Sequence, residues 1–153
     1  MRRLLGLHLD DQRHARLKTV SLFGELSSRE MAIVDGYLHK RHFRQHEVIF
    51  DEGDEGQAIY FILDGEVLIC PQGQVDKPIA ILKSGEFFGE LALLDDGRRV
   101  AQARAIADCE LAVFFRGDFE RLMGAHAVIA SKLALQLARV IGKRLRGMHQ
   151  ATA

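Results

Sequence analysis

Hydrophobic positions change their spacing twice along this chain, and the changes divide it into three parts. Apolar residues between Met31 and Leu38 recur at helical spacing, and Ser27 with Glu30 forms a capping-box pattern in front of them. This pattern predicts a helix over residues 28–39. Short apolar runs separated by turn residues follow, and they predict a series of strands. Helical spacing returns near Asp118 and predicts a short helix followed by one from about 125 to 146.

The central part predicts a rolled sheet. Its apolar runs indicate strands at residues 48–50, 58–63, 66–70, 79–82, 101–106 and 109–115. Asp64-Gly65 between two of these runs is typical of a two-residue hairpin. Short strands at this spacing favour a closed or rolled all-β unit. Residues 8–18 are polar and predict a short helix, so the fold is expected to be one mainly β domain with flanking helices.

Composition narrows the class of protein. The 153 residues suit one domain with a real core, and 48% of them are hydrophobic. No apolar run reaches the ~18–20 residues that cross a bilayer. We therefore expect a cytoplasmic protein without a membrane segment. Cys70 and Cys109 lie far apart in apolar segments, so we interpret them as buried side chains.

Two groups of polar residues have simple structural interpretations. His39, His42 and His46 have loose metal-like spacing, but they straddle a helix end and a strand start, so no metal site is expected. Formal charge is zero overall, whereas residues 131–153 hold five cations and no acid. A basic helix can meet a membrane surface, nucleic acid or an acidic partner. We favour the simpler interpretation, a solvated helix face.

The most informative segment is residues 87–101, called the cassette below. Gly89 and Glu90 precede a predicted helical turn at Leu91–Leu94, and Arg99 follows a turn. A glycine lets backbone approach a ligand closely, and the first amides of a helical turn are free to bind an anion. Arginine adds a permanent fork of donors, and a carboxylate accepts from a hydroxyl. The ordered set predicts a pocket for a phosphorylated ribose.

Each of these residues also has a structural interpretation. Glu90 could be an acid at a helix N-terminus, and Arg99 could pair with Asp95 or Asp96 on the surface. The ordered set inside a β framework favours binding over these alternatives. The chain has no G-x-x-x-x-G-K-[ST] loop, no G-x-S-x-G elbow and no H-E-x-x-H motif. We therefore expect no enzyme activity.

Residues 22–147 resemble the cyclic nucleotide-binding domain, the sensor module of the catabolite activator and protein kinase A regulatory-subunit family. The matching motifs are Leu22-Phe23, Glu47-Val48-Ile49-Phe50 with Gly53-Asp54, Tyr60-Phe61-Ile62-Leu63 with Gly65-Glu66-Val67, and Phe88-Gly89-Glu90-Leu91-Ala92-Leu93-Leu94. The resemblance implies a jelly-roll (double-stranded β-helix) fold with one N-terminal helix and two C-terminal helices. Residues 1–21 would then be an N-terminal extension and residues 148–153 a tail.

The resemblance also implies roles for individual residues. Glu90 would hold the ribose and Arg99 the cyclic phosphate, with help from the amides of Leu91 and Ala92. The full expected ligand-binding set is Gly89, Glu90, Leu91, Ala92, Arg99, Val100 and Ala101. The expected pocket walls are Val67, Ile79, Leu82 and Phe88. Leu135 and Arg139, with Lys143, are candidates for a lid over the base.

Four positions depart from the pattern of the family, among them His46, which stands where glycine is usual before Glu47 and is interpreted as structurally tolerated. Arg98 stands where many members have proline, Val100 where Ser or Thr is frequent, and Gln102 where Thr is frequent. Val100 has no hydroxyl to donate to the phosphate or to guanine. The missing hydroxyl favours cAMP over cGMP as the ligand, and no further cofactor is expected.

Three functional hypotheses follow. The first is a regulatory module in which the nucleotide repositions the C-terminal helices and thereby acts on an effector protein of unknown identity. The second is a scaffold that kept the fold and lost the ligand. The third is the sensor part of a catabolite-activator-type regulator. We expect no DNA-binding domain within these 153 residues, because no room for a helix-turn-helix follows the long helix. The apolar stripe Ile129–Leu145 predicts a homodimer along that helix.

Overall fold

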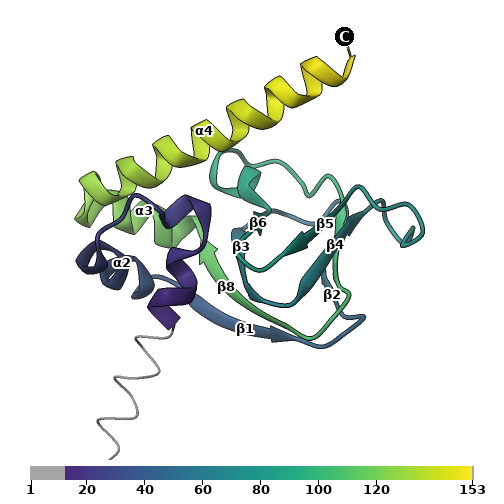
Figure 1. The fold of residues 1–153 in the computed structure, drawn as a ribbon, viewed down its shortest axis with the longest axis horizontal. Coiled ribbons are helices and arrows are strands. Elements are labelled where there is room, and N and C mark those ends of the chain that lie inside the picture. Colours follow the sequence, from purple (N-terminus) through teal and green to yellow (C-terminus); the bar gives the residue numbers. More distant parts are fainter. Residues whose placement is uncertain (1–12, 153) are drawn as a thin grey trace, which may run out of the picture.

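Eight short strands of the described region form two antiparallel sheets that curl around a common interior (Figure 1). The computed structural model describes residues 13–152, with side chains to residue 149. One sheet has the order β1(His39–Phe43), β8(Cys109–Phe115), β3(Ala58–Asp64), β6(Phe87–Phe88). The other has the order β2(Val48–Phe50), β7(Gln102–Ala105), β4(Glu66–Cys70), β5(Ala80–Lys83). The predicted mainly β roll with flanking helices is confirmed.

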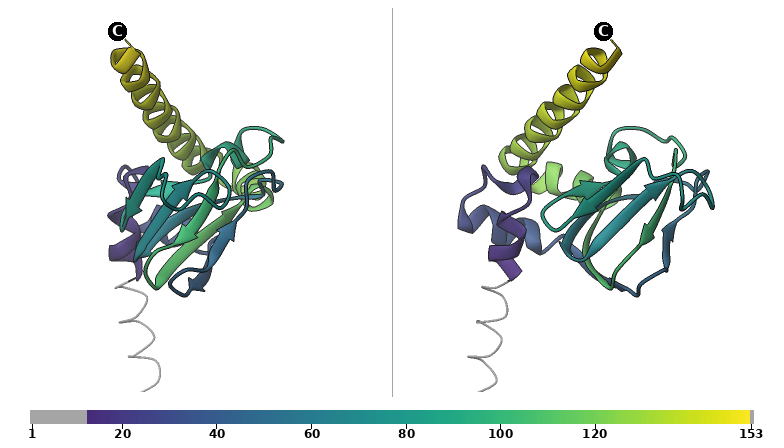
Figure 2. Two further views of the ribbon diagram at one scale, coloured as in Figure 1. Left: turned by 90° about the vertical axis from the view of Figure 1, so that its right-hand side faces the viewer. Right: turned by 45° about the vertical axis from the view of Figure 1, so that its right-hand side comes forward.

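Helices cover one end of the roll. Residues 13–18 are helical, and they are followed by η1(Ser21–Phe23) and α2(Ser28–Asp35). The 3-10 turn η2(Glu90–Leu93) lies within the cassette, and α3(Arg116–Ala125) leads into α4(Ala127–Thr152). The last turns of α4 extend away from the roll, as Figure 2 shows. Residues 8–12 of the predicted first helix lie outside the described residues.

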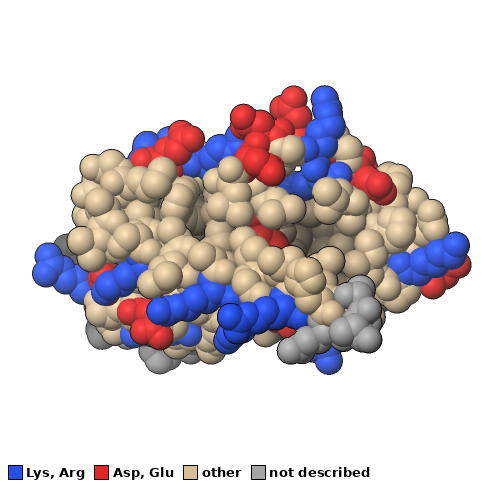
Figure 3. Space-filling model, turned by 90° about the horizontal axis from the view of Figure 1, so that it is seen from above, with Lys and Arg blue, Asp and Glu red and all other residues tan. Residues whose placement is uncertain are grey.

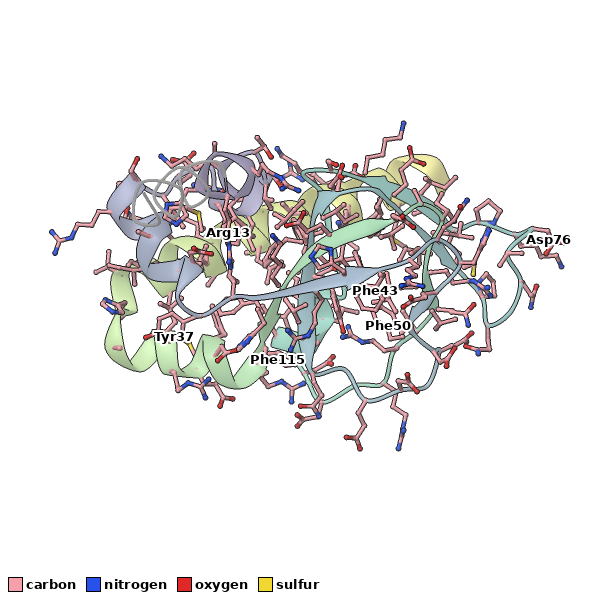
Figure 4. All side chains as sticks on the ribbon, turned by 90° about the horizontal axis from the view of Figure 1, so that it is seen from below. Arg13, Tyr37, Phe43, Phe50, Asp76 and Phe115 are labelled. Atoms are coloured by element: carbon pink, nitrogen blue, oxygen red, sulfur yellow. The ribbon has the colours of Figure 1, made fainter. Side chains whose placement is uncertain are left out.

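Two apolar cores hold these elements together. The first lies where the helices meet the β3–β8 sheet, and Phe23, Met31, Phe61 and Phe114 are almost fully buried in it. The second lies between the sheets and contains Ile62, Val67, Phe88 and Leu111. Figure 4 labels Phe43 on β1 and Phe50 on β2, which pack at the edge of this second core.

Helical structure continues on both sides of residues 22–147. Leu17 and Val20 have no exposed area and belong to the first core, so the end of the expected N-terminal extension packs with the domain. Helix α4 continues without a break past residue 147 to Thr152. Cys70 and Cys109 are both buried and unpaired, as predicted.

The first helix ends earlier than its apolar pattern predicts. The capping box of Ser27 and Glu30 is present with both hydrogen bonds, so the predicted start is confirmed. The predicted end at residue 39 is wrong, because α2 stops at Asp35 and residues 39–43 form β1. This strand is mostly exposed and polar, and pairing with β8 rather than an apolar pattern determines its conformation.

The turn at Asp64-Gly65 is a corner between sheets and not a hairpin. Strands β3 and β4 flank it but pair with different neighbours, β3 with β6 and β8, and β4 with β5 and β7. A type I′ hairpin turn needs positive φ at both central residues. Only Gly65 has it here, with a φ of 103°, so the chain passes from one sheet to the other.

Candidate functional site

A cavity of about 360 Å³ lies between the cassette, strands β4 and β5, and helix α4. Its wall is mostly apolar, and charged side chains reach it from two elements. The lining residues are Phe50, Gly56, Ile69, Ala80, Leu82, Phe87, Phe88, Gly89, Glu90, Leu91, Ala92, Gly97, Arg98, Arg99, Val100, Ala101 and Arg144. The structure therefore brings all seven predicted ligand-binding residues to one cavity.

Arg99 is held in this cavity by backbone carbonyls and an aromatic ring. Its Nη1 donates to the carbonyl of Gly89 over 3.0 Å, and its Nη2 donates to that of Ala58 over 2.6 Å. The guanidinium carbon lies 4.1 Å from the centroid of the Phe50 ring. Its Nε is buried and has no hydrogen-bond partner. Burial lowers the pKa of Arg99, and the chain therefore holds a fixed, desolvated cation with one unused donor.

Backbone pairing decides which arginine faces inward. The amide of Arg99 donates to the carbonyl of Asp54 over 2.7 Å, and the carbonyl of Arg99 accepts from Gly53 over 2.8 Å. Neighbouring residues of such an extended segment point to opposite sides. Arg98 accordingly is exposed at the rim of the cavity, where its Nη1 donates to the carbonyl of Gly53 over 2.9 Å.

Gly89 is required by this arrangement. It has a φ of 76°, which side-chain-bearing residues adopt at a cost. A Cβ atom at this position would lie 2.5 Å from Nη1 of Arg99. The glycine therefore makes room for the arginine as well as for the backbone turn into η2.

Glu90 is the acid of the site and has a partner from a distant helix. Its side chain is 15% exposed, and its Oε1 accepts from Nη1 of Arg144. The guanidinium carbon of Arg144 also lies 5.3 Å from the centroid of the Phe87 ring. No pattern in the sequence indicates Arg144 as a site residue, because nothing local connects two residues 54 positions apart.

The amides of η2 are less free than expected. The predicted turn Leu91–Leu94 is a 3-10 turn over Glu90–Leu93. The amide of Ala92 donates to the carbonyl of Gly89 over 3.2 Å. The expectation that the Ala92 amide lacks a partner is therefore wrong, because a 3-10 turn closes its hydrogen bonds three residues apart.

Arg116 at the start of α3 ties the cassette to the C-terminal helices. Its Nε donates to the carbonyl of Ala92 over 2.7 Å, and its Nη2 donates to that of Gly56 over 3.1 Å. Its Nη1 pairs with Asp96, on the loop that follows η2. One side chain thus joins α3 to η2, to the loop after it and to the β2–β3 connection, so these segments are expected to move together.

The predicted walls are partly wrong. Leu82 and Phe88 line the cavity, but Val67 is fully buried in the second core and Ile79 is 63% exposed. Strand β5 begins at Ala80, and its alternation places Ala80 and Leu82 toward the cavity and Ile81 outward. Ile79 lies before the strand begins, and alternation would in any case place residues three positions apart on opposite faces. Ile69, which the sequence analysis did not select, is also part of the wall.

The predicted lid residues do not reach the cavity. Among the described side chains of α4, Arg144 lines it, whereas Leu135, Arg139 and Lys143 are exposed on other faces of the helix. Gln102 also lies away from the cavity. Its Nε2 donates to Asp51 over 2.7 Å and its Oε1 accepts from the amide of Gly73 over 3.3 Å, so it anchors the β4–β5 loop, whose tip carries Asp76 in Figure 4.

Two further classes of site are absent from the described residues. No helix between residues 13 and 152 is long and apolar enough to cross a membrane. No group of three or more His, Cys, Asp and Glu side chains in that range is arranged to hold a metal ion. His39 instead lies 3.1 Å from the carboxylate of Asp118.

Comparisons with known proteins agree with the geometry. A cyclic AMP receptor protein from Thermus thermophilus is 38% identical over 125 residues, which are 80% of this chain and 58% of that protein. A cAMP-dependent protein kinase regulatory subunit from Emericella nidulans is 39% identical over 110 residues, 72% of this chain and 26% of that protein. The crystal structure of the Thermus thermophilus catabolite activator protein is 34% identical with a TM-score of 0.72, covering 86% of this chain and 63% of that one.

This chain spans less than two thirds of each of these relatives. The model of the cyclic nucleotide-binding domain matches residues 40–126, more than half of the 153 residues. The matched segment contains the cassette, both sheets and the start of the C-terminal helices. Together with the cavity around Arg99 and Glu90, this match shows that the chain belongs to the cyclic nucleotide-binding domain family.

Proposed function

We propose that this chain is a cAMP sensor whose C-terminal helices change position when the nucleotide binds, and that this movement regulates a partner protein. One observation carries the proposal. A partly unpartnered guanidinium, Arg99, and a mostly buried carboxylate, Glu90, line one cavity of about 360 Å³. Ligand pockets of a few hundred cubic ångströms suit a molecule of nucleotide size.

The ligand would use this chemistry as follows. The cyclic phosphate carries one negative charge and would bind Arg99, whose surroundings are already desolvated. Glu90 would accept from the ribose 2′-hydroxyl. A carboxylate beside a phosphate is unfavourable unless a donor lies between them, and the hydroxyl is that donor. Leu82 and Ile69 offer apolar area to the base.

The proposed ligand is cAMP and not cGMP because of Val100. This residue lines the cavity and is 77% exposed, so its side chain is available to a ligand. It offers no hydroxyl to guanine. A missing hydrogen bond is worth about 1 kcal/mol, or roughly fivefold in affinity.

A physical route from the ligand to the helices supports the regulatory part of the proposal. Arg116 joins η2 to α3, so a shift of the cassette would move that helix. A second, almost wholly apolar cavity of about 380 Å³ lies between η2, α3 and α4, with Leu93, Phe119 and Leu137 in its lining. This space allows the elements to repack against one another. A ligand shifts such an equilibrium only by binding one arrangement better.

Isothermal titration tests the proposal with a matched pair of variants. Wild type should bind cAMP more tightly than cGMP. Arg99→Ala should weaken cAMP binding by about 10- to 100-fold, because it removes charge-assisted hydrogen bonds worth about 1.5–3 kcal/mol. Arg41→Ala, an exposed arginine of β1 outside the cavity, should leave binding unchanged. Equal affinities of wild type and Arg99→Ala, in variants with intact thermal unfolding, would contradict the proposal.

Two other functions predict different results. A scaffold that has lost its ligand would show no thermal shift with cAMP, cGMP or cyclic dinucleotides. The sensor part of a catabolite-activator-type regulator would bind cAMP as proposed here, and the 58% coverage of the Thermus thermophilus relative is consistent with it. We propose no catalytic role, since the named relatives are a receptor and a kinase regulatory subunit.

A further inference from the structure

Arg144 connects the last turns of α4 to the ligand cavity. Its Nη1 contacts Oε1 of Glu90, and its guanidinium lies against the Phe87 ring. It also lines the cavity that contains Arg99. Figure 3 shows Lys and Arg side chains along the face that α4 crosses. Among the described basic side chains of α4 beyond residue 142, only that of Arg144 lines the cavity.

Glu90 has a strong reason to keep this partner. Its side chain is 15% exposed, and a carboxylate withdrawn from water requires a donor. The guanidinium supplies a hydrogen bond and a full positive charge, whereas a ribose hydroxyl would supply the hydrogen bond without the charge. The ribose hydroxyl of the proposed ligand would therefore approach a carboxylate whose Oε1 is already paired with α4.

The Arg144 side chain also borders the space next to Glu90 that the ligand would occupy. Arg144 is 47% exposed and forms part of the cavity wall, so its side chain stands at the edge of the space that a nucleoside would fill. Arg99 is held by two backbone carbonyls from the cassette and β3, whereas Arg144 is held to the roll by one carboxylate and one ring. Of the two cations, Arg144 is the one that can leave at small cost.

We propose that Arg144 is an internal competitor of the nucleotide for Glu90, so that the ligand-free protein keeps α4 latched to the cassette and the ribose hydroxyl releases it. The proposal rests on the proposed function, because it takes Glu90 as the ribose acceptor. By linkage, two factors must then be equal. The factor by which the contact between Arg144 and Glu90 weakens nucleotide binding equals the factor by which the bound nucleotide weakens that contact.

Titration of Arg144→Ala with cAMP tests the competition. Alanine keeps the helix propensity of α4, so the variant removes the side chain without unwinding the helix. We expect about two- to fivefold tighter cAMP binding, the scale of a partly exposed ion pair. Arg146→Ala, an exposed arginine two positions along the same helix, is the control and should bind like wild type. The gain should shrink near 1 M salt, where charges are screened beyond about 3 Å.

A modified ligand tests the mechanism of release. 2′-Deoxy-cAMP lacks the hydroxyl that would replace Arg144, so Arg144→Ala should improve its binding less than that of cAMP. Hydrogen exchange provides a readout without any ligand. Amides of residues 143–152 should exchange faster in ligand-free Arg144→Ala and in Glu90→Gln than in wild type or Arg146→Ala.

The outcomes separate the two proposals. If wild type binds cAMP but Arg144→Ala binds it equally or more weakly, the competitor role is wrong and the sensor function stands. If wild type binds no cyclic nucleotide, the sensor function fails. The exchange experiment then still decides whether Arg144 latches α4 to Glu90, and unchanged exchange in Arg144→Ala would overturn the latch as well.

Discussion

At the scale of single residues, the backbone conformation, and not the type of side chain, decides which residues face the cavity. Arg98 and Arg99 are chemically identical neighbours, yet Arg98 is exposed and donates to the carbonyl of Gly53, whereas Arg99 is half-buried against the Phe50 ring. The pairing of their backbone with Gly53 and Asp54 makes the difference. Val100, next in the chain, is again exposed, so the alternation continues through the site.

His46 provides a test of residue-scale strain. It has a φ of 75°, the one positive value that the structure describes for a residue other than glycine. We expect His46→Gly to raise the free energy of unfolding by about 1 kcal/mol, because the left-handed region costs a side-chain-bearing residue about that much. Urea unfolding measures the change. His42→Gly in the extended strand β1 is the control and should destabilise the protein, since glycine loses more chain entropy there.

At the scale of elements, side chains distant in sequence tie the helices to the roll. Glu30 caps α2 and also pairs with Lys132 of α4, with Oε1 and Oε2 lying 2.8 and 2.9 Å from Nζ. The hydrogen bond from Lys132, followed by that from the Ser27 amide, lowers the pKa of Glu30 below its ordinary value of 4.5. One carboxylate therefore serves the start of one helix and the packing of another.

This lowered pKa predicts how stability depends on pH. A carboxylate with a lowered pKa in the folded state stabilises the protein above its unfolded pKa, and the contribution disappears as the pH falls through the folded value. Lys132→Met should raise the pKa of Glu30 toward 4.5. The variant should be less stable than wild type at pH 7, and the difference should shrink as the pH falls below 4.5 and through the lowered pKa of Glu30 in the folded protein.

Urea unfolding at several pH values between 7 and 3 measures this difference. Lys143→Met, at an exposed position of the same helix, is the control and should differ from wild type by an amount that does not change with pH. A Lys132→Met deficit that does not diminish at all as the pH falls below 4.5 would show that the methylene contacts of Lys132, and not the ion pair, stabilise the fold.

Strand β1 illustrates what sequence patterns miss at this scale. Its residues His39, Lys40 and Arg41 are exposed, so they carry no apolar alternation. They adopt strand conformation because they pair with β8. Lys40 and Arg16 also form ion pairs with Glu110 of β8. A periodicity argument cannot identify a strand whose conformation depends on a partner about 70 residues away.

At the scale of the whole molecule, α4 decides how the chain presents itself to other molecules. Part of the predicted dimer stripe is used within the domain, because Ile129, Leu133 and Leu137 are buried in the first core. Leu135 and Leu145 are each about half exposed, and with Ala138 and Gly142 they follow a three-four spacing along α4. Such a seam is typical of paired helices.

We predict that the chain forms a homodimer through this seam. Light scattering should give twice the mass of the chain for wild type, and Leu145→Lys should give the mass of a monomer, because it places a charge in an apolar interface. Val128→Lys, at an exposed position at the other end of α4, is the control and should remain dimeric. A wild-type monomer with and without cAMP would exclude the dimer.

The sequence by itself determined the elements that depend on neighbouring residues. The alternation of apolar runs and turns predicted the β framework, and the capping box predicted the start of α2. The order of Gly89, Glu90 and Arg99 predicted where a cavity would form. These features could be predicted because φ preferences, hydrogen-bond capping and side-chain period act within a few residues.

Only the tertiary structure decided which side chains meet across the molecule. It selected Leu82 over Ile79 for the cavity wall, turned Asp64-Gly65 into a corner between sheets, and brought Arg144 to Glu90. Each of these depends on strand register or on where a helix packs, and both are set by the joint burial of distant apolar faces. The contact between Arg144 and Glu90 is therefore the feature of this site that no local pattern could have indicated.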